Sequence, residues 1–122
     1  MYKTTKKDFA EFKKECEYWI DYFGLKSYEW DIRHEVTHTE SARAEYRLQY
    51  AGRYVCVRLN KTWDVVKEKN EIKFCAFHEI CHIMICGLAE MSYTTFSDIK
   101  VETEEHKIIA ILENTIFKEK RK

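Results

Sequence analysis

A long apolar segment near the middle of the chain constrains the fold more than any other feature of the sequence. From residue 74 to residue 88, nearly every side chain is apolar, and the polar exceptions are His78, Glu79 and His82. A helix that is apolar on almost all sides is buried, because any face turned to water would expose hydrophobic side chains. We therefore expect a buried central helix from about Asn70, with Gly87 at its end.

The segments on either side of this helix predict an α+β fold. Aromatic and apolar residues recur at helical spacing from Phe9 to Phe23, after a possible cap at Thr4 or Thr5 and before a natural stop at Gly24. Alternation of apolar and polar side chains predicts three hairpin-linked, antiparallel strands within residues 28–34, 42–50 and 54–59. A last helix is expected from Ser97 or Asp98 towards Lys118, with an apolar stripe formed by Ile108, Ile109, Leu112 and Ile116.

Composition narrows the class of protein. The chain has 122 residues, enough for a single domain over residues 1–122. Its formal net charge is zero, so neither nucleic acid nor a membrane is an expected partner. No signal peptide or membrane-spanning run is apparent, and five cysteines without a C-x-x-C pair favour reduced thiols. We therefore expect a cytoplasmic protein.

The polar residues of the central helix form an H-E-x-x-H string, His78-Glu79-Ile80-Cys81-His82. Residues four apart lie one above the other on a helix, so both imidazoles can reach one Zn²⁺ ion. Glu79 points about 100° round the helix, where it can take a proton from zinc-bound water as the general base. The alternative is that both histidines are hydrogen-bonded core residues, but two of them on so apolar a helix need partners to offset their burial.

A second copy of the string occurs at His34-Glu35-Val36-Thr37-His38, so the string alone does not identify the site. Its surroundings are β-branched and alternate with period two, which indicates an extended segment. In that conformation His34 and His38 would be about 13 Å apart, too far to share an ion. The copy on the apolar helix is therefore the predicted zinc site.

A third zinc ligand must come from another segment, because catalytic zinc takes three protein ligands and keeps one position for water. At 100° per residue, Glu105 falls within about 60° of every residue of the apolar stripe of the last helix, which favours it as the inward-facing ligand. Three neighbours stay open as alternatives: Glu102, Glu104 and His106. Further possibilities are a thiolate ligand from Cys75 or Cys86, although both suit small buried positions, and an oxyanion contact from Tyr93.

The order of these features resembles that of the small metallopeptidases common in phages and prophages, which are loosely related to the ImmA/IrrE and SprT-like zinc peptidases. The segments that carry the resemblance are Trp30-Asp31-Ile32, Ala42-Arg43-Ala44-Glu45, Arg58-Leu59-Asn60, His78–His82, Glu104–Ile109 and Leu112-Glu113-Asn114. The resemblance implies a minimal zincin-like fold, in which an edge strand can hold an extended peptide, and the host cytoplasm if a phage encodes the chain. SprT-like proteins use a third histidine, whereas an inward Glu105 favours the glutamate type.

Two functions follow as hypotheses. The first is a zinc-dependent metallopeptidase that hydrolyses a protein or peptide substrate, with His78, His82 and Glu105 as metal ligands and Glu79 as catalytic base. The second is a non-catalytic, zinc-stabilised module that binds a protein as an inhibitor or adaptor.

Overall fold

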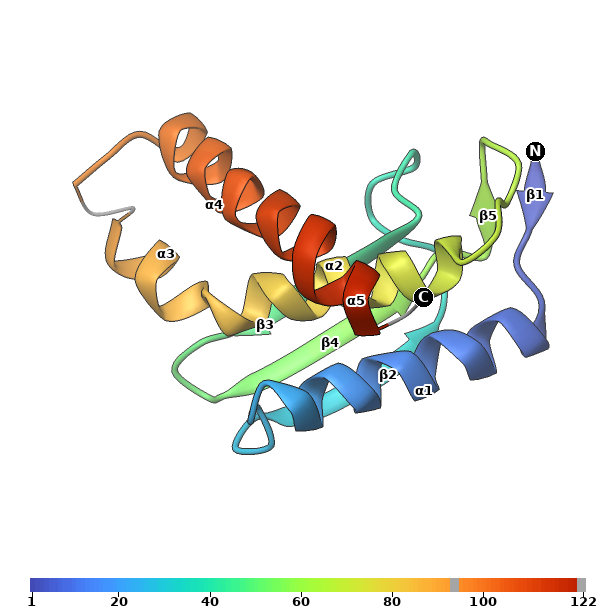
Figure 1. The fold of residues 1–122 in the computed structure, drawn as a ribbon, viewed down its shortest axis with the longest axis horizontal. Helices are drawn as coiled ribbons and strands as arrows, with labels where there is room; N and C mark the ends of the chain where they lie inside the picture. Colours follow the sequence, from blue (N-terminus) through green and yellow to red (C-terminus); the bar gives the residue numbers. More distant parts are fainter. Residues whose placement is uncertain (93–94, 121–122) are drawn as a thin grey trace.

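A computed structural model of the chain describes residues 1–92 and 95–120 and has a mixed α+β architecture (Figure 1). The strands are β1 (Tyr2–Lys3), β2 (Glu29–His34), β3 (Ala44–Gln49), β4 (Tyr54–Leu59) and β5 (Thr62–Trp63). The helices are α1 (Lys6–Tyr22), α2 (Glu71–Met84), α3 (Cys86–Ser92), α4 (Asp98–Leu112), a π-helical turn η1 (Glu113–Phe117) and α5 (Lys118–Lys120). Within the described residues, no helix is long and apolar enough to cross a membrane.

The main sheet has the order β2-β4-β3 and is mixed, so the predicted antiparallel pairing throughout was wrong. Strands β3 and β4 form the expected antiparallel hairpin, with Tyr46 opposite Val57. Strand β2 instead pairs with β4 in parallel, with Trp30 opposite Val55, because residues 35–43 carry the chain past β4 before β3 begins. Period-two alternation identifies a strand but carries no information about its neighbour. Strands β1 and β5 form a separate antiparallel pair, and two residues each are too few to show a period.

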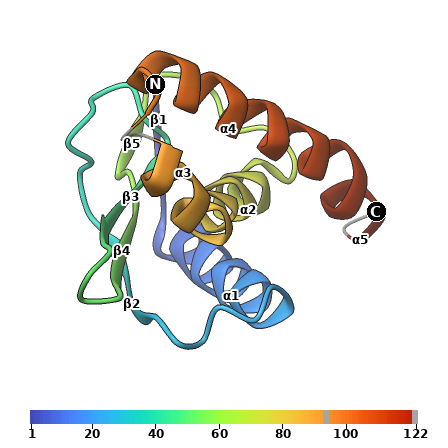
Figure 2. The same ribbon diagram turned by 90° about the vertical axis from the view of Figure 1, so that its left-hand side faces the viewer.

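Helices α1 and α2 cover one face of the main sheet, and α4 crosses α2 on the side away from α1 (Figure 2). The core between these layers is aromatic: Trp19 of α1 and Phe77 of α2 are both fully buried, with ring centroids 4.6 Å apart. Full burial of a side chain of this size contributes about 1.5–3 kcal/mol. Helix α2 is therefore enclosed by α1, the sheet and α4, as its apolar sequence predicts.

Local sequence signals account for both ends of α1. Thr5 caps its start with a complete capping box, in which the Thr5 hydroxyl accepts from the Asp8 backbone N–H and the Asp8 carboxylate accepts from the Thr5 N–H. Gly24 follows the helix with φ of +69°, a left-handed conformation that favours glycine.

The end of the central helix differs from the prediction. Helix α2 stops at Met84, and Gly87 lies in the first turn of the next helix, α3. A Cβ atom at Gly87 would lie 3.3 Å from the Tyr50 hydroxyl, at the turn between β3 and β4. Gly87 therefore lies against the Tyr50 side chain rather than at the end of α2.

Candidate metal centre

Helix α2 places the two histidines of its motif side by side. His78 and His82 are one turn apart, their ring centroids lie 5.0 Å apart, and their Nε2 atoms are separated by 3.3 Å. His82 is buried, whereas the His78 side chain is 28% exposed. The pair therefore lies at the edge of the core, with one side open to solvent.

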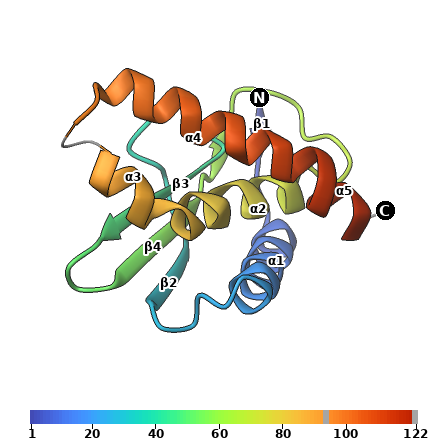
Figure 3. The same cartoon turned by 60° about the vertical axis from the view of Figure 1, so that its left-hand side comes forward.

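A third histidine reaches this pair from α4. Figure 3 shows α4 crossing α2. Ser97 caps α4 by accepting from the Lys100 backbone N–H, and one buried line of the helix runs through Val101, Glu105 and Ile109. His106 follows Glu105 and is itself exposed. One ring nitrogen from each of His78, His82 and His106 lies within 4.8 Å of the other two, and this group could hold a metal ion.

The Nδ1 atom of each of the three histidines faces an oxygen atom. His82 Nδ1 lies 2.9 Å from a carboxylate oxygen of Glu105, and His78 Nδ1 lies 2.9 Å from one of Glu113. His106 Nδ1 lies 2.8 Å from the backbone carbonyl of Glu102. Carboxylate and carbonyl oxygens accept hydrogen bonds, so all three Nδ1 atoms act as donors. In neutral rings, every Nε2 is then left with its lone pair.

This arrangement fits a tetrahedral metal ion. Two nitrogens bound at 2.0–2.1 Å with a tetrahedral angle between them are about 3.3 Å apart, which is the spacing of the His78 and His82 Nε2 atoms. With both Nδ1 atoms donating to carboxylates, two lone pairs at this distance repel each other unless a proton or a cation lies between them. His78 and His82 are each anchored through the other ring nitrogen, and three imidazoles form a ligand set that suits Zn²⁺.

Charge at the motif helix is set by burial and by neighbouring carboxylates. Burial of His78 lowers its pKa, but its hydrogen bond to Glu113 and the charges of Glu79, Glu113 and Glu105 outweigh that effect, so the net pKa is raised. Burial raises the pKa of Glu79 from 4.5 to about 8, while His78 lowers it and Glu45 raises it further. A cation at the centre would favour ionised Glu79, because opposite charge nearby stabilises the carboxylate.

Glu105 lies within the predicted site, but its carboxylate contacts a histidine nitrogen. It is buried, and its bond to His82 Nδ1 gives it the position of an outer partner to that ring. The three-histidine group contains His106, which the sequence left as an alternative. The ligand set of His78, His82 and Glu105 therefore stays a prediction, with His106 as its competitor.

The remaining candidate ligands are two glutamates of α4 and two cysteines. Glu104 is exposed and pairs with Lys107 at 3.1 Å, and Glu102 contributes its backbone carbonyl to His106. Cys75 is buried, which raises the pKa of its thiol to about 12, and Cys86 lies 3.3 Å from the Tyr28 hydroxyl. Tyr93 lies outside the described residues. Ile108, expected in the buried stripe, is 37% exposed, because the stripe is centred on Glu105 and Ile109.

The second H-E-x-x-H string has local roles. His34 Nε2 lies 2.7 Å from the Thr4 hydroxyl, and its ring stacks on Phe9 with centroids 5.2 Å apart. His38 contacts Glu45 through both its backbone N–H and its Nδ1. The contacts of His34 connect the end of β2 to the N-terminal segment, and those of His38 connect the loop after β2 to β3.

Two neighbours of the centre were not anticipated from the sequence. Tyr46 of β3 stacks on the His82 ring, with centroids 4.9 Å apart and planes inclined by 26°. Glu113 of η1 bonds His78. The alternation in the sequence places Tyr46 on the same face of the strand as Ala44 and Leu48. No local pattern indicates which helix residue that face contacts. Glu113 is eight residues after Glu105, and an ordinary helix would carry it about 80° away from that line.

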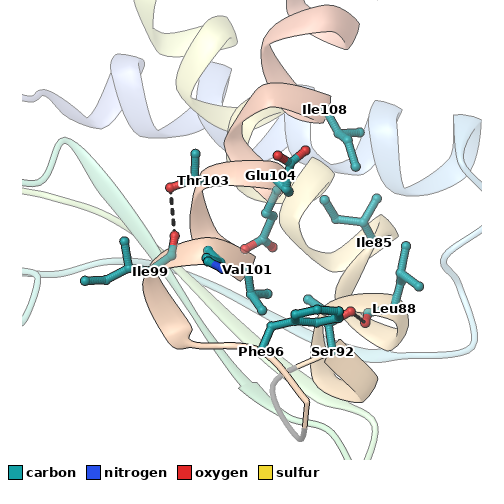
Figure 4. Close-up of a pocket in the computed structure, with 12 residues that line it drawn as sticks. Ile85, Leu88, Ser92, Phe96, Ile99, Val101, Thr103, Glu104 and Ile108 are labelled. Carbon is teal, nitrogen blue, oxygen red and sulfur yellow. Dashed lines mark hydrogen bonds between the residues drawn. The ribbon is translucent and has the colours of Figure 1, made fainter.

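An apolar cavity of about 530 Å³ lies between α3 and α4, beside the centre (Figure 4). Its wall includes Leu88 and Phe96, which are 64% and 57% exposed, together with Ile85 and Ile108. Glu105 lines this cavity, but the three histidines do not. The cavity therefore lies beside the candidate metal centre and is not its opening.

Comparison with models of known protein families, with curated proteins and with solved structures finds no match to this chain.

Proposed function

We propose that the chain is a zinc-dependent hydrolase of peptide bonds. The observation that carries the proposal is the convergence of one nitrogen each from His78, His82 and His106 within 4.8 Å, with every Nδ1 held by an oxygen acceptor. Three protein ligands leave one position of a tetrahedral ion for water, which is the pattern of catalytic rather than structural zinc. Zinc bound in this way polarises a carbonyl and lowers the pKa of its water to near 7.

Glu79 supplies the proton transfer in this proposal. Its carboxylate accepts a proton from the attacking water and passes it to the amine nitrogen as the peptide bond breaks. Burial supports this role, because it raises the pKa of Glu79 to about 8, so the proton is held more tightly than by an ordinary carboxylate. The base and two ligands share helix α2, whose rigidity in the core fixes their relative positions.

The sheet offers a surface for an extended substrate. Strand β3 is at the edge of the β2-β4-β3 sheet, and Tyr46 brings that strand against His82. An edge strand presents backbone N–H and C=O groups that can pair with an added strand. A peptide paired with β3 would therefore pass beside the centre, which supports a peptide rather than a small molecule as the substrate class.

Metal analysis together with a peptide-library digest tests the proposal. We expect about one zinc per chain in the purified wild type and cleavage that a chelator abolishes. Glu79→Gln keeps the shape of the side chain but cannot act as a base, so it should retain zinc and lose roughly 10²–10⁴-fold in rate. A wild type that contains no zinc, or Glu79→Gln with full hydrolytic activity, would contradict the proposal.

The apolar cavity between α3 and α4 favours a second candidate, the zinc-stabilised binding module. Leu88 and Phe96 expose large apolar surfaces beside it, and such patches commonly mark protein contacts. Glu79→Gln separates the two functions. A binding module keeps partner binding in Glu79→Gln and loses it in Phe96→Asp. A peptidase loses hydrolysis in Glu79→Gln and keeps it in Phe96→Asp.

A further inference from the structure

The turn that follows α4 changes its helical geometry where it passes the metal centre. Residues Glu113–Phe117 form a π-helix between the α-helices α4 and α5. Such turns are rare, and they occur as single insertions within α-helices, frequently at functional sites. Here the turn begins with Glu113, whose carboxylate lies 2.9 Å from His78 Nδ1.

A regular α-helix would not keep its contacts with α2 over this length. Residues spaced by four drift about 40° round an α-helix at each step, so Phe117 would be about 120° away from Glu105. A π-helical turn holds more residues per turn and rotates less at each residue, which reverses this drift. The turn begins at Glu113, so the regular α-helix α4 carries Glu105 to His82 and Glu113 to His78. The turn then brings Phe117 onto Phe77, with ring centroids 5.1 Å apart.

Both ends of the turn are fixed by these contacts. Phe117 is 7% exposed and packs among the rings of Trp19, Phe74 and Phe77. The Glu113 side chain is 13% exposed, so its bond to His78 is largely shielded from water. A carboxylate held on a ligand histidine in this way fixes the tautomer and the orientation of the ring, and raises the basicity of its other nitrogen.

We propose that Glu113 is a positioning residue of the zinc site, held at the start of a π-helical turn whose other end is anchored by Phe117, and that it orients the His78 ring so that Nε2 faces the ion. The inference rests on the zinc site of the proposed function, but not on peptide hydrolysis. It assigns the C-terminal turn a role in metal affinity, because movement of Phe117 or Glu113 would release the His78 ring.

Zinc affinity, measured by competition with a chromophoric chelator, tests this role in three variants of the full chain. Glu113→Ala should bind zinc roughly 10–100-fold more weakly than the wild type. Glu113→Gln keeps an oxygen that accepts from Nδ1 and should recover most of that loss. The matched control is Glu104→Ala, which removes an exposed carboxylate of α4 and should bind zinc as the wild type does.

A second measurement separates positioning from a general loss of structure. Long-range ¹H–¹⁵N spectra of the imidazoles report which ring nitrogen carries the proton. In Glu113→Ala, the protected Nδ1–H signal of His78 should be lost, while that of His82, held by Glu105, should persist. Unchanged zinc affinity in Glu113→Ala, or equal loss of both signals, would overturn the inference.

Failure of the positioning role can be distinguished from failure of the proposed peptidase function. A protein that binds zinc through His78 but cleaves no peptide removes the peptidase proposal and leaves the positioning role intact. If the wild type binds no zinc, the zinc site fails and the positioning role fails with it, even where the His78 Nδ1–H signal depends on Glu113.

Discussion

Replacement of His106 or Glu105 tests which of them is the third ligand of the proposed zinc site. In the three-histidine arrangement, His106→Ala removes a nitrogen that lies within 4.8 Å of the other two. Glu105→Ala removes only the acceptor 2.9 Å from His82 Nδ1 and leaves all three nitrogens in place. The two changes therefore remove interactions of different kinds from adjacent positions of one helix.

The expected losses differ by about one order of magnitude. Zinc binding by zinc-finger peptides is worth about 10–16 kcal/mol, or about 2.5–4 kcal/mol for each of four ligands. Loss of a ligand should then weaken binding roughly 10²–10³-fold, since each 1.4 kcal/mol is tenfold. Loss of an outer hydrogen-bond partner weakens binding about 10–100-fold. We therefore expect His106→Ala to bind zinc more weakly than Glu105→Ala.

Chelator competition at fixed pH measures both dissociation constants, and the visible spectrum of the Co²⁺-substituted protein reports coordination. Loss of His106 should change that spectrum, whereas loss of Glu105 should leave its main features in place. His106 is exposed, so its replacement should leave the melting temperature of the metal-free protein unchanged. The reverse order of affinities, with Glu105→Ala the weaker binder, would refute the three-histidine site and restore the carboxylate ligand predicted from the sequence.

Three further predictions concern pH, the second motif and stability. In the metal-free protein, burial raises the Glu79 pKa to about 8, so the folded state keeps a proton that the unfolded chain releases near 4.5. The free energy of unfolding, measured with urea, should therefore fall relative to that of Glu79→Gln as pH rises from 5 to 8, and parallel curves would contradict this. His34→Ala and His38→Ala should both keep a full equivalent of zinc, and zinc loss in either variant would move the site to the second motif. His34→Ala should also lose about 1–2 kcal/mol of stability, because it removes the hydrogen bond to Thr4. Thr5→Ala should lower stability by about 1 kcal/mol through loss of the α1 cap, visible as a lower melting temperature, and an unchanged value would show that the cap is redundant.

The elements that the sequence predicted well depend on contacts between near neighbours in the chain. The cap of α1 at Thr5, one of the two predicted residues, the end of that helix before Gly24, and the shared face of His78 and His82 all involve residues within about one helical turn. Their geometry follows from the repeat of the helix, which is the same wherever the helix is placed. The second motif was separated from the first for the same reason, since its surroundings have a different period.

The contact of Glu105 does not follow from the helical repeat alone. Its place on the inward face of the last helix was correct, and it is buried. An inward carboxylate can bind either a metal ion or a histidine nitrogen. Which of the two it contacts depends on the register of α4 along α2, to within less than one helical turn. In the structure that register places Glu105 on His82 Nδ1 and brings His106 to the ligand group.

The sequence by itself therefore determined a buried helix that presents two histidines and a glutamate, and the capped helix and hairpin that enclose it. Only the tertiary structure decided the parallel pairing of β2 with β4, the position of His106 beside His78 and His82, and the contact of Glu113 with His78 at the start of the π-helical turn. The first set follows from backbone repeats that act over a few residues. The second depends on packing between segments far apart in the chain, such as Phe117 against Phe77, where no local repeat specifies the register.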